Sequence, residues 1–208
     1  EAEKYSKRSL TILEKKWGKN HVQVATNLGQ LAAIHLIKAE YSKAESLLKR
    51  QLAIYESMPN PEISLLVKSF NNLASVYERQ GNYVKAEALL KRALEVHEKT
   101  VGPNHPDLAF ILDNLSVAYT ELGQLEKVEP ILKRSLEIRE KNLGENNEDT
   151  AKSLNLLALF YHKQGQFTKA DPLYQRALKI RVARLGPNHP DVAETLSNLA
   201  DMDVKQNH

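Results

Sequence analysis

Two histidine–carboxylate tripeptides are the residues most suited to acid–base or metal chemistry. His105-Pro106-Asp107 and His189-Pro190-Asp191 are identical, and His21 occupies the matching place earlier in the chain. Imidazole is both a general acid–base group and a common metal ligand. The three histidines are spaced by 84 residues, however (189 − 105 = 84 and 105 − 21 = 84). In an array of helices, each ~10 Å thick, side chains so far apart in sequence cannot meet at one ion. We therefore expect no metal site, and a structural role for the tripeptide in a turn.

Other catalytic signatures are missing from the sequence. It contains no Gly-rich phosphate loop, no HExxH zinc motif and no nucleophile elbow. Paired carboxylates such as Glu121 and Glu126 lie among lysines, as on a solvated helix face. There is no cysteine, which excludes disulfides and cysteine-based zinc sites. We expect neither enzymatic activity nor a cofactor.

The charge and hydropathy of the chain restrict its partners. The 208 residues carry a formal net charge of only +3, too little for a nucleic-acid footprint. The basic pairs that recur along the chain, such as Lys91-Arg92, are followed by glutamates that offset them. The longest apolar runs, such as 156–161, are far too short to span a bilayer. We expect a soluble, cytoplasmic protein that binds neither nucleic acid nor membrane.

Two sets of glycines repeat in phase along the whole chain. The segment Gly-Pro-Asn-His-Pro-Asp begins at Gly102 and again at Gly186, and a degraded copy begins midway at Gly144. The spacing of 84 is therefore twice a period of 42 (144 − 102 = 42 and 186 − 144 = 42). A second set, Gly81, Gly123 and Gly165, has the same spacing. A fixed period of this size indicates a repeat protein.

Each repeat reads as two helices, a first helix A and a second helix B. The apolar set Ala109, Leu112, Leu115, Ser116 and Tyr119 forms one stripe of helix A, with steps of three and four residues. The predicted array has these parts: 1–17 as a lone helix B, full repeats at 22–59, 64–101, 106–143 and 148–185, and 190–207 as an unpaired helix A.

Cap residues predict where these helices begin and end. Pro106 and Pro190 are expected at the first helical position, where a missing N–H costs nothing. The glycines of the second set are expected to end helix A in the left-handed conformation. Helix B is expected to start at Ser42 and its equivalents, with a capping box in the first copy. The loop at 57–61 has lost the motif and is expected to deviate.

These units resemble tetratricopeptide repeats (TPRs). The small residues Ala74 and Ala86, the aromatic Tyr77 and the turn Gly81-Asn82-Tyr83 carry the likeness. The 42-residue spacing, with LGPNHPDVA at 185–193, is similar to the repeats of the kinesin light chain type. The resemblance implies an all-α, right-handed superhelical solenoid of antiparallel helix pairs, with the A helices on its concave wall. It also implies binding of a peptide or a partner's helix there, since such repeats serve as adaptors, sensors and scaffolds.

A second stripe of helix A, beside the core stripe, differs from repeat to repeat. Core positions are held alike by identical packing, whereas a recognition surface is free to diversify. Asn71 and Asn155 resemble the asparagines that clamp a peptide backbone in grooves of the kinesin light chain type, because an amide both donates and accepts hydrogen bonds. The alternative is that each is a solvated helix-face residue. In the repeat between them Asp113 can only accept. The predicted peptide-binding residues are Lys68, Asn71, Ser75, Arg79, Phe110, Asp113, Val117, Lys152, Asn155, Leu159, His162 and Lys163.

The same stripe continues into the first and last A helices. Its first-helix members are Thr26, Gly29, Ala33, Leu36 and Ile37. The last three are apolar, and could hold an aliphatic side chain or pack beneath a further repeat. We expect a non-catalytic peptide-binding module. The alternative is a sensor or oligomerisation arm that self-associates through its terminal helices.

Overall fold

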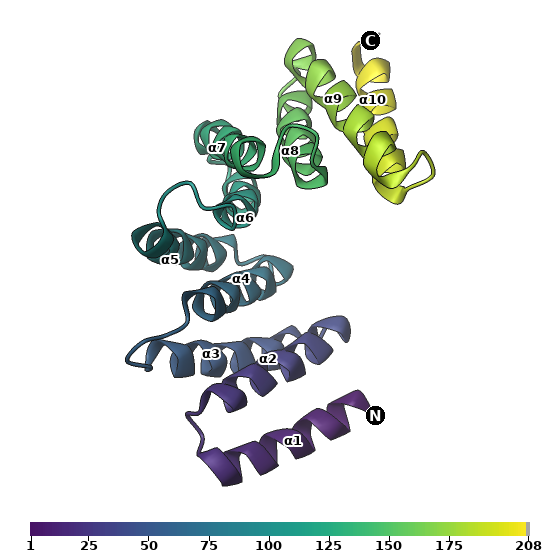
Figure 1. The fold of residues 1–208 in the computed structure, drawn as a ribbon. Coiled ribbons are helices and arrows are strands. Elements are labelled where there is room, and N and C mark those ends of the chain that lie inside the picture. Colours follow the sequence, from purple (N-terminus) through teal and green to yellow (C-terminus); the bar gives the residue numbers. More distant parts are fainter. Residues whose placement is uncertain (207–208) are drawn as a thin grey trace. The chain divides into compact units, whose positions relative to one another are not determined.

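The computed structural model describes residues 1–206, and all secondary structure in that range is helical (Figure 1). Its helices are α1 (Ala2–Trp17), α2 (Val22–Ile37), α3 (Tyr41–Glu56), α4 (Ile63–Arg79), α5 (Tyr83–Val101), α6 (Leu108–Glu121), α7 (Leu125–Leu143), α8 (Glu148–Lys163), α9 (Phe167–Leu185) and α10 (Pro190–Gln206). The predicted all-α class is confirmed. None of these helices combines the length and apolarity needed to cross a bilayer.

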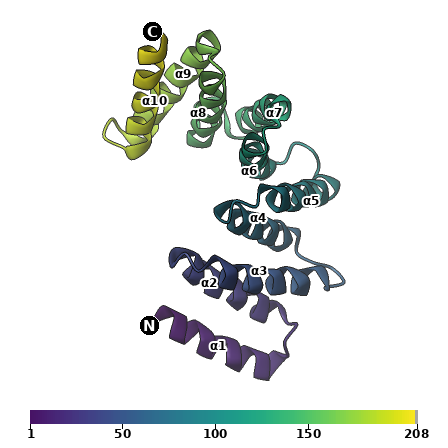
Figure 2. The same cartoon turned by 180° about the vertical axis from the view of Figure 1, so that it is seen from behind.

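Consecutive helices pack as antiparallel pairs, which Figures 1 and 2 show from opposite sides. Even-numbered helices are the A helices and odd-numbered ones the B helices. The pairs are α2 with α3, α4 with α5, α6 with α7, and α8 with α9. Helix α10 packs on α9, and α1 on α2. The last residue of the predicted 190–207 segment lies outside the described residues.

The chain divides into two compact units. The first comprises residues 1–102, with α1 to α5, and the second begins at Pro103, with α6 to α10. In the first unit, Leu28, Leu48, Phe70 and Leu90 are fully buried between the helices. In the second unit the whole predicted stripe of α6 is buried, as is its equivalent on α8. The 3.6-residue period therefore identified the core correctly.

Glycine ends the A helices as predicted. Gly81, Gly123 and Gly165 have φ of 72°, 71° and 67°, in the left-handed region. After α4, the Asn82 N–H donates to the Tyr77 carbonyl and the Gly81 N–H to the Glu78 carbonyl. These two bonds form the Schellman pattern, which satisfies the last carbonyls of the helix.

Five predicted helix starts were wrong: that at Pro106 and those of the four B helices, which begin one residue earlier, at Tyr41, Tyr83, Leu125 and Phe167. Pro106 lies in a turn, and α6 begins two residues later at Leu108, whereas Pro190 does open α10. Helix α3 begins at Tyr41, so Ser42 is already helical and does not cap it. The preceding residue, Glu40, makes no side-chain cap bond either. The backbone carbonyl of Glu40 accepts the N–H groups of Lys43 and Ala44 at this end.

The motif histidines cap the turns that lead into the A helices. His21, His105 and His189 each accept at Nδ1 the N–H of the residue two places on, at 3.2–3.3 Å. Asn147 Oδ1 does the same for Asp149 at 2.8 Å. The tripeptide thus has a local structural role, because it satisfies N–H groups that no helical carbonyl reaches. Asn147 in the degraded copy was the available signal, since asparagine is a preferred cap.

The loop after α3 deviates, as expected. Helix α3 has 16 residues, whereas α5, α7 and α9 have 19. At the other B-to-A junctions, Gly102, Gly144 and Gly186 combine φ of 86–95° with ψ near 160°. That region is essentially restricted to glycine. Asn60 stands at the equivalent place and does not adopt a positive φ, so the chain takes another path.

Candidate functional site

The variable stripe lines one pocket in the second unit, between α6, α7 and α8. This α6–α8 pocket has a volume of about 140 Å³. Val117 and Leu159, equivalent residues of successive A helices, lie on its opposite sides, and Glu121 and Lys163 are a second equivalent pair. Two predicted A-helix stripes therefore face one another across a shared hollow.

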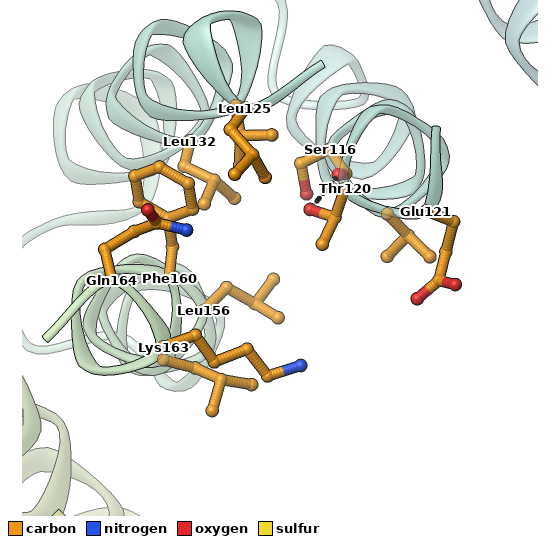
Figure 3. A pocket seen from close by; sticks show the side chains of 12 residues that line it. Ser116, Thr120, Glu121, Leu125, Leu132, Leu156, Phe160, Lys163 and Gln164 are labelled. Carbon is orange, nitrogen blue, oxygen red and sulfur yellow. Dashed lines mark hydrogen bonds between the residues drawn. The ribbon is translucent and has the colours of Figure 1, made fainter. Parts of the chain in front are cut away.

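The wall of the α6–α8 pocket is mainly apolar. Leu125 and Leu132 come from α7, and Leu156 and Phe160 from α8, as Figure 3 shows. Glu121, on the right of that view, and Lys163, in its lower part, carry opposite charges. The contribution of α7 was not predicted, because Leu125 lies at the start of a B helix. An apolar hollow with a charged rim can accept a hydrophobic side chain and discriminate its neighbours.

A second pocket lies in the first unit, between α2, α3 and α4. This α2–α4 pocket has a volume of about 420 Å³. Its wall includes Thr26, Gly29 and Ala33 of the first-helix stripe, together with Lys68 of the next A helix. The remaining lining comes from Gln30, Gln51, Tyr55, Leu65, Ser69 and Asn72. It is more polar in composition than the α6–α8 pocket.

Most of the predicted binding residues are accessible. Lys68, Arg79, Phe110, Val117, Lys152 and Lys163 are exposed, and Ser75 and Leu159 are half-buried. The ammonium of Lys152 lies 5.8 Å from the centre of the Phe110 ring, within range of a cation–π contact. Since Phe110 is on α6 and Lys152 on α8, this contact also bridges two A helices.

Four predicted binding residues are buried instead, so the alternative of a solvated helix-face residue was wrong for Asn71 and Asn155. Asn71, Asp113, Asn155 and His162 are each at most 6% exposed. Asn71 Nδ2 donates to the Val67 carbonyl of its own helix at 3.1 Å. Asn155 Nδ2 donates to Glu194 Oε1 at 3.2 Å. Peptide binding by these side chains stays a prediction.

Asp113 belongs to a buried polar network that joins three helices. Its Oδ2 lies 2.7 Å from Arg139 Nη1, and its Oδ1 accepts the Ser135 hydroxyl at 2.6 Å. Arg139 also donates to Ser153 on α8. Burial raises the pKa of Asp113, while the positive charge of Arg139 and the hydrogen bonds from Ser135 and Arg139 lower it. A buried ion pair needs these additional hydrogen bonds to offset desolvation, so Asp113 serves the packing of α6, α7 and α8.

Arg181 repeats the position of Arg139 one period later. Its Nη1 donates to the Asp191 carbonyl and to Thr195 Oγ1, both at 2.7 Å, and so ties α9 to α10. Neither arginine was among the predicted residues. The available signal was that both occupy the B-helix position that Tyr55 and His97 occupy in the two preceding repeats, where it is buried.

His162 is enclosed by the helices of the last repeats. Its Nδ1 lies 3.5 Å from the Tyr174 hydroxyl and its Nε2 lies 3.4 Å from Asp201 Oδ2. Burial lowers the pKa of His162, Lys205 lowers it further, and Asp201 raises it in part. The imidazole is therefore mainly uncharged at neutral pH. Unlike Lys152 and Lys163, it would not offer a positive charge to a bound peptide.

Paired helices of one period, a shared apolar core and pockets along the A helices define a helical-repeat scaffold. The Tetratricopeptide repeat family model matches residues 1–57, 65–141 and 149–208, and the chain belongs to that family. Its members are typically protein–protein interaction modules and generally non-catalytic. A search of curated proteins gave no match.

Solved structures with a similar fold include relatives of the kinesin light chain type. BtubC (BKLC) from P. vanneervenii has a TM-score of 0.84 at 24% identity, over 97% of this chain and 81% of that one. The nearly identical TPR-like repeats of a candidate kinesin light chain from Podosopora anserina give 0.76 at 23%, over 87% and 85%. A STAND signal transduction ATPase from Pyrococcus horikoshii, with a tetratricopeptide repeat sensor, gives 0.72 at 18%, over 85% and 26%. At these identities the likeness concerns the fold.

Proposed function

We propose that this chain is a non-catalytic module that binds an extended peptide, or a helix of a partner protein, against its A helices. The observation that carries the proposal is the position of the variable stripe. In each unit several of the residues that differ between repeats line a pocket, while the apolar core residues of the same helices are buried. A surface that varies over a constant core is suited to recognition.

The α6–α8 pocket would supply the apolar anchor. A leucine- or phenylalanine-sized side chain that becomes fully buried there would contribute about 1.5–3 kcal/mol. Val117 is 42% exposed, so its surface is available for such a contact. Lys163 and Glu121 would then favour charged residues of opposite sign on either side of the anchor.

Asn155 would contribute a backbone contact in the second unit. Its Nδ2 is engaged by Glu194, whereas its buried Oδ1 has no hydrogen-bond partner among the described residues. That oxygen could accept an N–H from a peptide laid along α8. Asp113 is not part of this proposal, since both its oxygens face Arg139 and Ser135.

Two matched valine substitutions test the proposed groove. Val117 lines the α6–α8 pocket, and Val182, on the B helix α9, does not, although their exposed fractions are similar at 42% and 39%. Random dodecapeptides are selected for binding to the wild-type chain, and their Kd values are measured by fluorescence anisotropy. Val117→Asp should weaken binding by about tenfold or more, because it puts a charge where the anchor sits. Val182→Asp should leave Kd unchanged. Equal loss in both variants, or in neither, would contradict the groove assignment.

Self-association is a second candidate, favoured by the terminal helices. Tyr5 and Ile12 on α1, and Leu196 and Val204 on α10, are large apolar side chains that are about half exposed or more. Such residues favour contact with another chain or a further repeat. Light scattering over a range of protein concentrations separates the candidates, because only self-association makes the apparent mass rise with concentration.

The same proposal includes that the chain has no catalytic activity and needs no cofactor. Proteins of this family generally act by holding other proteins, and the pockets described here would bind side chains. The cytoplasmic location stays a prediction.

A further inference from the structure

The first repeat exchanges a large and a small residue between its two helices. Where α4, α6 and α8 carry Asn71, Asp113 and Asn155, α2 carries Gly29 (29 + 42 = 71). On the B helices the relation is reversed. Gln51 stands on α3 where the later repeats have a small residue (51 + 42 = 93), namely Ala93, Ser135 and Ala177.

The geometry explains why the two changes occur together. Gln51 is only 7% exposed, and its Nε2 donates to the Ala25 carbonyl on α2 at 3.0 Å. A Cβ added at Gly29 would lie 2.3 Å from that Nε2, far closer than real Cβ atoms come to other atoms. Glycine at position 29 therefore makes room for an amide that reaches across from α3.

The bond to Ala25 also fixes which way the amide points. A flipped amide would place Oε1 against the Ala25 carbonyl oxygen, so Nε2 must be the atom that faces it. Oε1 is then left buried with no hydrogen-bond partner among residues 1–206. A buried acceptor without a partner costs free energy. The other repeats have a small residue at this place and bury no such amide there.

Gln51 also lines the α2–α4 pocket. The pocket wall around it contains Tyr55, whose hydroxyl lies 3.3 Å from Thr26 Oγ1, and the exposed Lys68. An acceptor, hydroxyl groups and a cation thus border one hollow. This set complements an extended peptide that presents a backbone N–H and an acidic side chain close together.

We propose that Gln51 is a ligand-binding residue of the first unit, which supplies from α3 the amide that Asn71 and Asn155 supply from A helices. Its Oε1 accepts a backbone N–H of the bound peptide, and Lys68 pairs with an acidic side chain beside it. This assignment rests on the proposed function, because it names a contact of the same kind of groove. It adds a binding position on a B helix.

A rescue experiment tests the assignment on the full chain. Dodecapeptides selected on the wild-type chain are sorted by NMR, and those that shift the Gln51 side-chain amide signal are retained as probes. Gln51→Ala should weaken their binding about tenfold, the cost of one buried hydrogen bond. Gly29→Asn/Gln51→Ala, which installs the residue pair of the second repeat, should return Kd to within about threefold of wild type. Urea denaturation of each variant shows whether it folds.

The outcomes distinguish this inference from the proposal on which it rests. Unchanged binding in Gln51→Ala, or failure of a folded double variant to restore it, would overturn the role of Gln51. In that case Val117→Asp would still reduce binding of other selected peptides if the groove function is correct. If no peptide binds the wild-type chain with measurable affinity, both proposals fail.

Discussion

At the residue scale, one helical position serves different purposes in successive repeats. The same position of helix A is occupied by Gly29, Asp113 and Asn155 in three of the repeats. Gly29 makes room for Gln51, Asp113 pairs with Arg139, and Asn155 donates a hydrogen bond to Glu194. In the low-dielectric space between helices, a polar group must be matched by what faces it. The role of each of these residues therefore depends on the side chain that the facing helix places opposite it.

Glu78 is expected to make the stability of the first unit depend on pH. It lies on α4, half-buried, with no hydrogen-bond partner for its buried Oε1 among the described residues. Burial raises its pKa from 4.5 to about 6, and the nearby Arg79 only partly opposes this. The folded state therefore holds the proton more tightly than the unfolded state. Protonated Glu78 therefore stabilises the folded state below pH 4.5. This contribution to the free energy of unfolding, at most about 2 kcal/mol, is lost as the pH rises through about 6.

Glu78→Gln removes this titration. Urea denaturation of both proteins between pH 4 and pH 8 should show the variant gaining stability relative to wild type as pH rises. At pH 4 the two should be nearly equal. A constant difference over the whole range would mean that Glu78 titrates normally.

At the element scale, the helix ends depend on a few left-handed residues. In the described part of the chain, Ala39 is the one non-glycine residue with a positive φ, 56°, and it stands where later repeats have Gly81 and Gly123. A left-handed alanine costs about 1–2 kcal/mol relative to ordinary conformations. A Cβ at Gly123 would meet nothing within 4 Å, so only the backbone penalty applies there.

Reciprocal substitutions at these two turns should have opposite effects. Ala39→Gly is expected to stabilise the chain by up to about 1 kcal/mol, after the greater entropy of glycine in the unfolded state is subtracted. Gly123→Ala is expected to destabilise it by about 1 kcal/mol. Chemical denaturation gives both values. Changes of the same sign would show that contacts, rather than the φ angle, determine the ends of α2 and α6.

At the scale of the whole molecule, stability is expected to be uneven. Helix α1 contains no buried residue, whereas nine residues of α8 are buried. In a repeat array each helix is stabilised mainly by its neighbours, and poorly covered elements open first. Amide hydrogen exchange should therefore be faster in α1 than in α8. Equal protection of the two helices would indicate that α1 is covered, for example by self-association, and dilution would then restore its exchange.

The sequence alone determined the helix pairs, their period and their core stripes. These features depend on interactions over a few residues: glycine at left-handed turns, such as Gly123 and Gly165, and apolar side chains three and four residues apart. It also indicated the surface that diversifies, because Val117 and Leu159 differ from each other and from their equivalents Ala33 and Ser75.

Only the tertiary structure decided which members of that surface are accessible. Asp113 and Asn155 share a stripe with Val117, but their burial depends on Arg139 and Glu194, which other helices bring to them. The same holds for Gln51, whose contact with Ala25 spans 26 residues. The physical reason is that helical periodicity sets the direction of a side chain, whereas its burial and its hydrogen bonds depend on which side chains the adjacent helix places opposite.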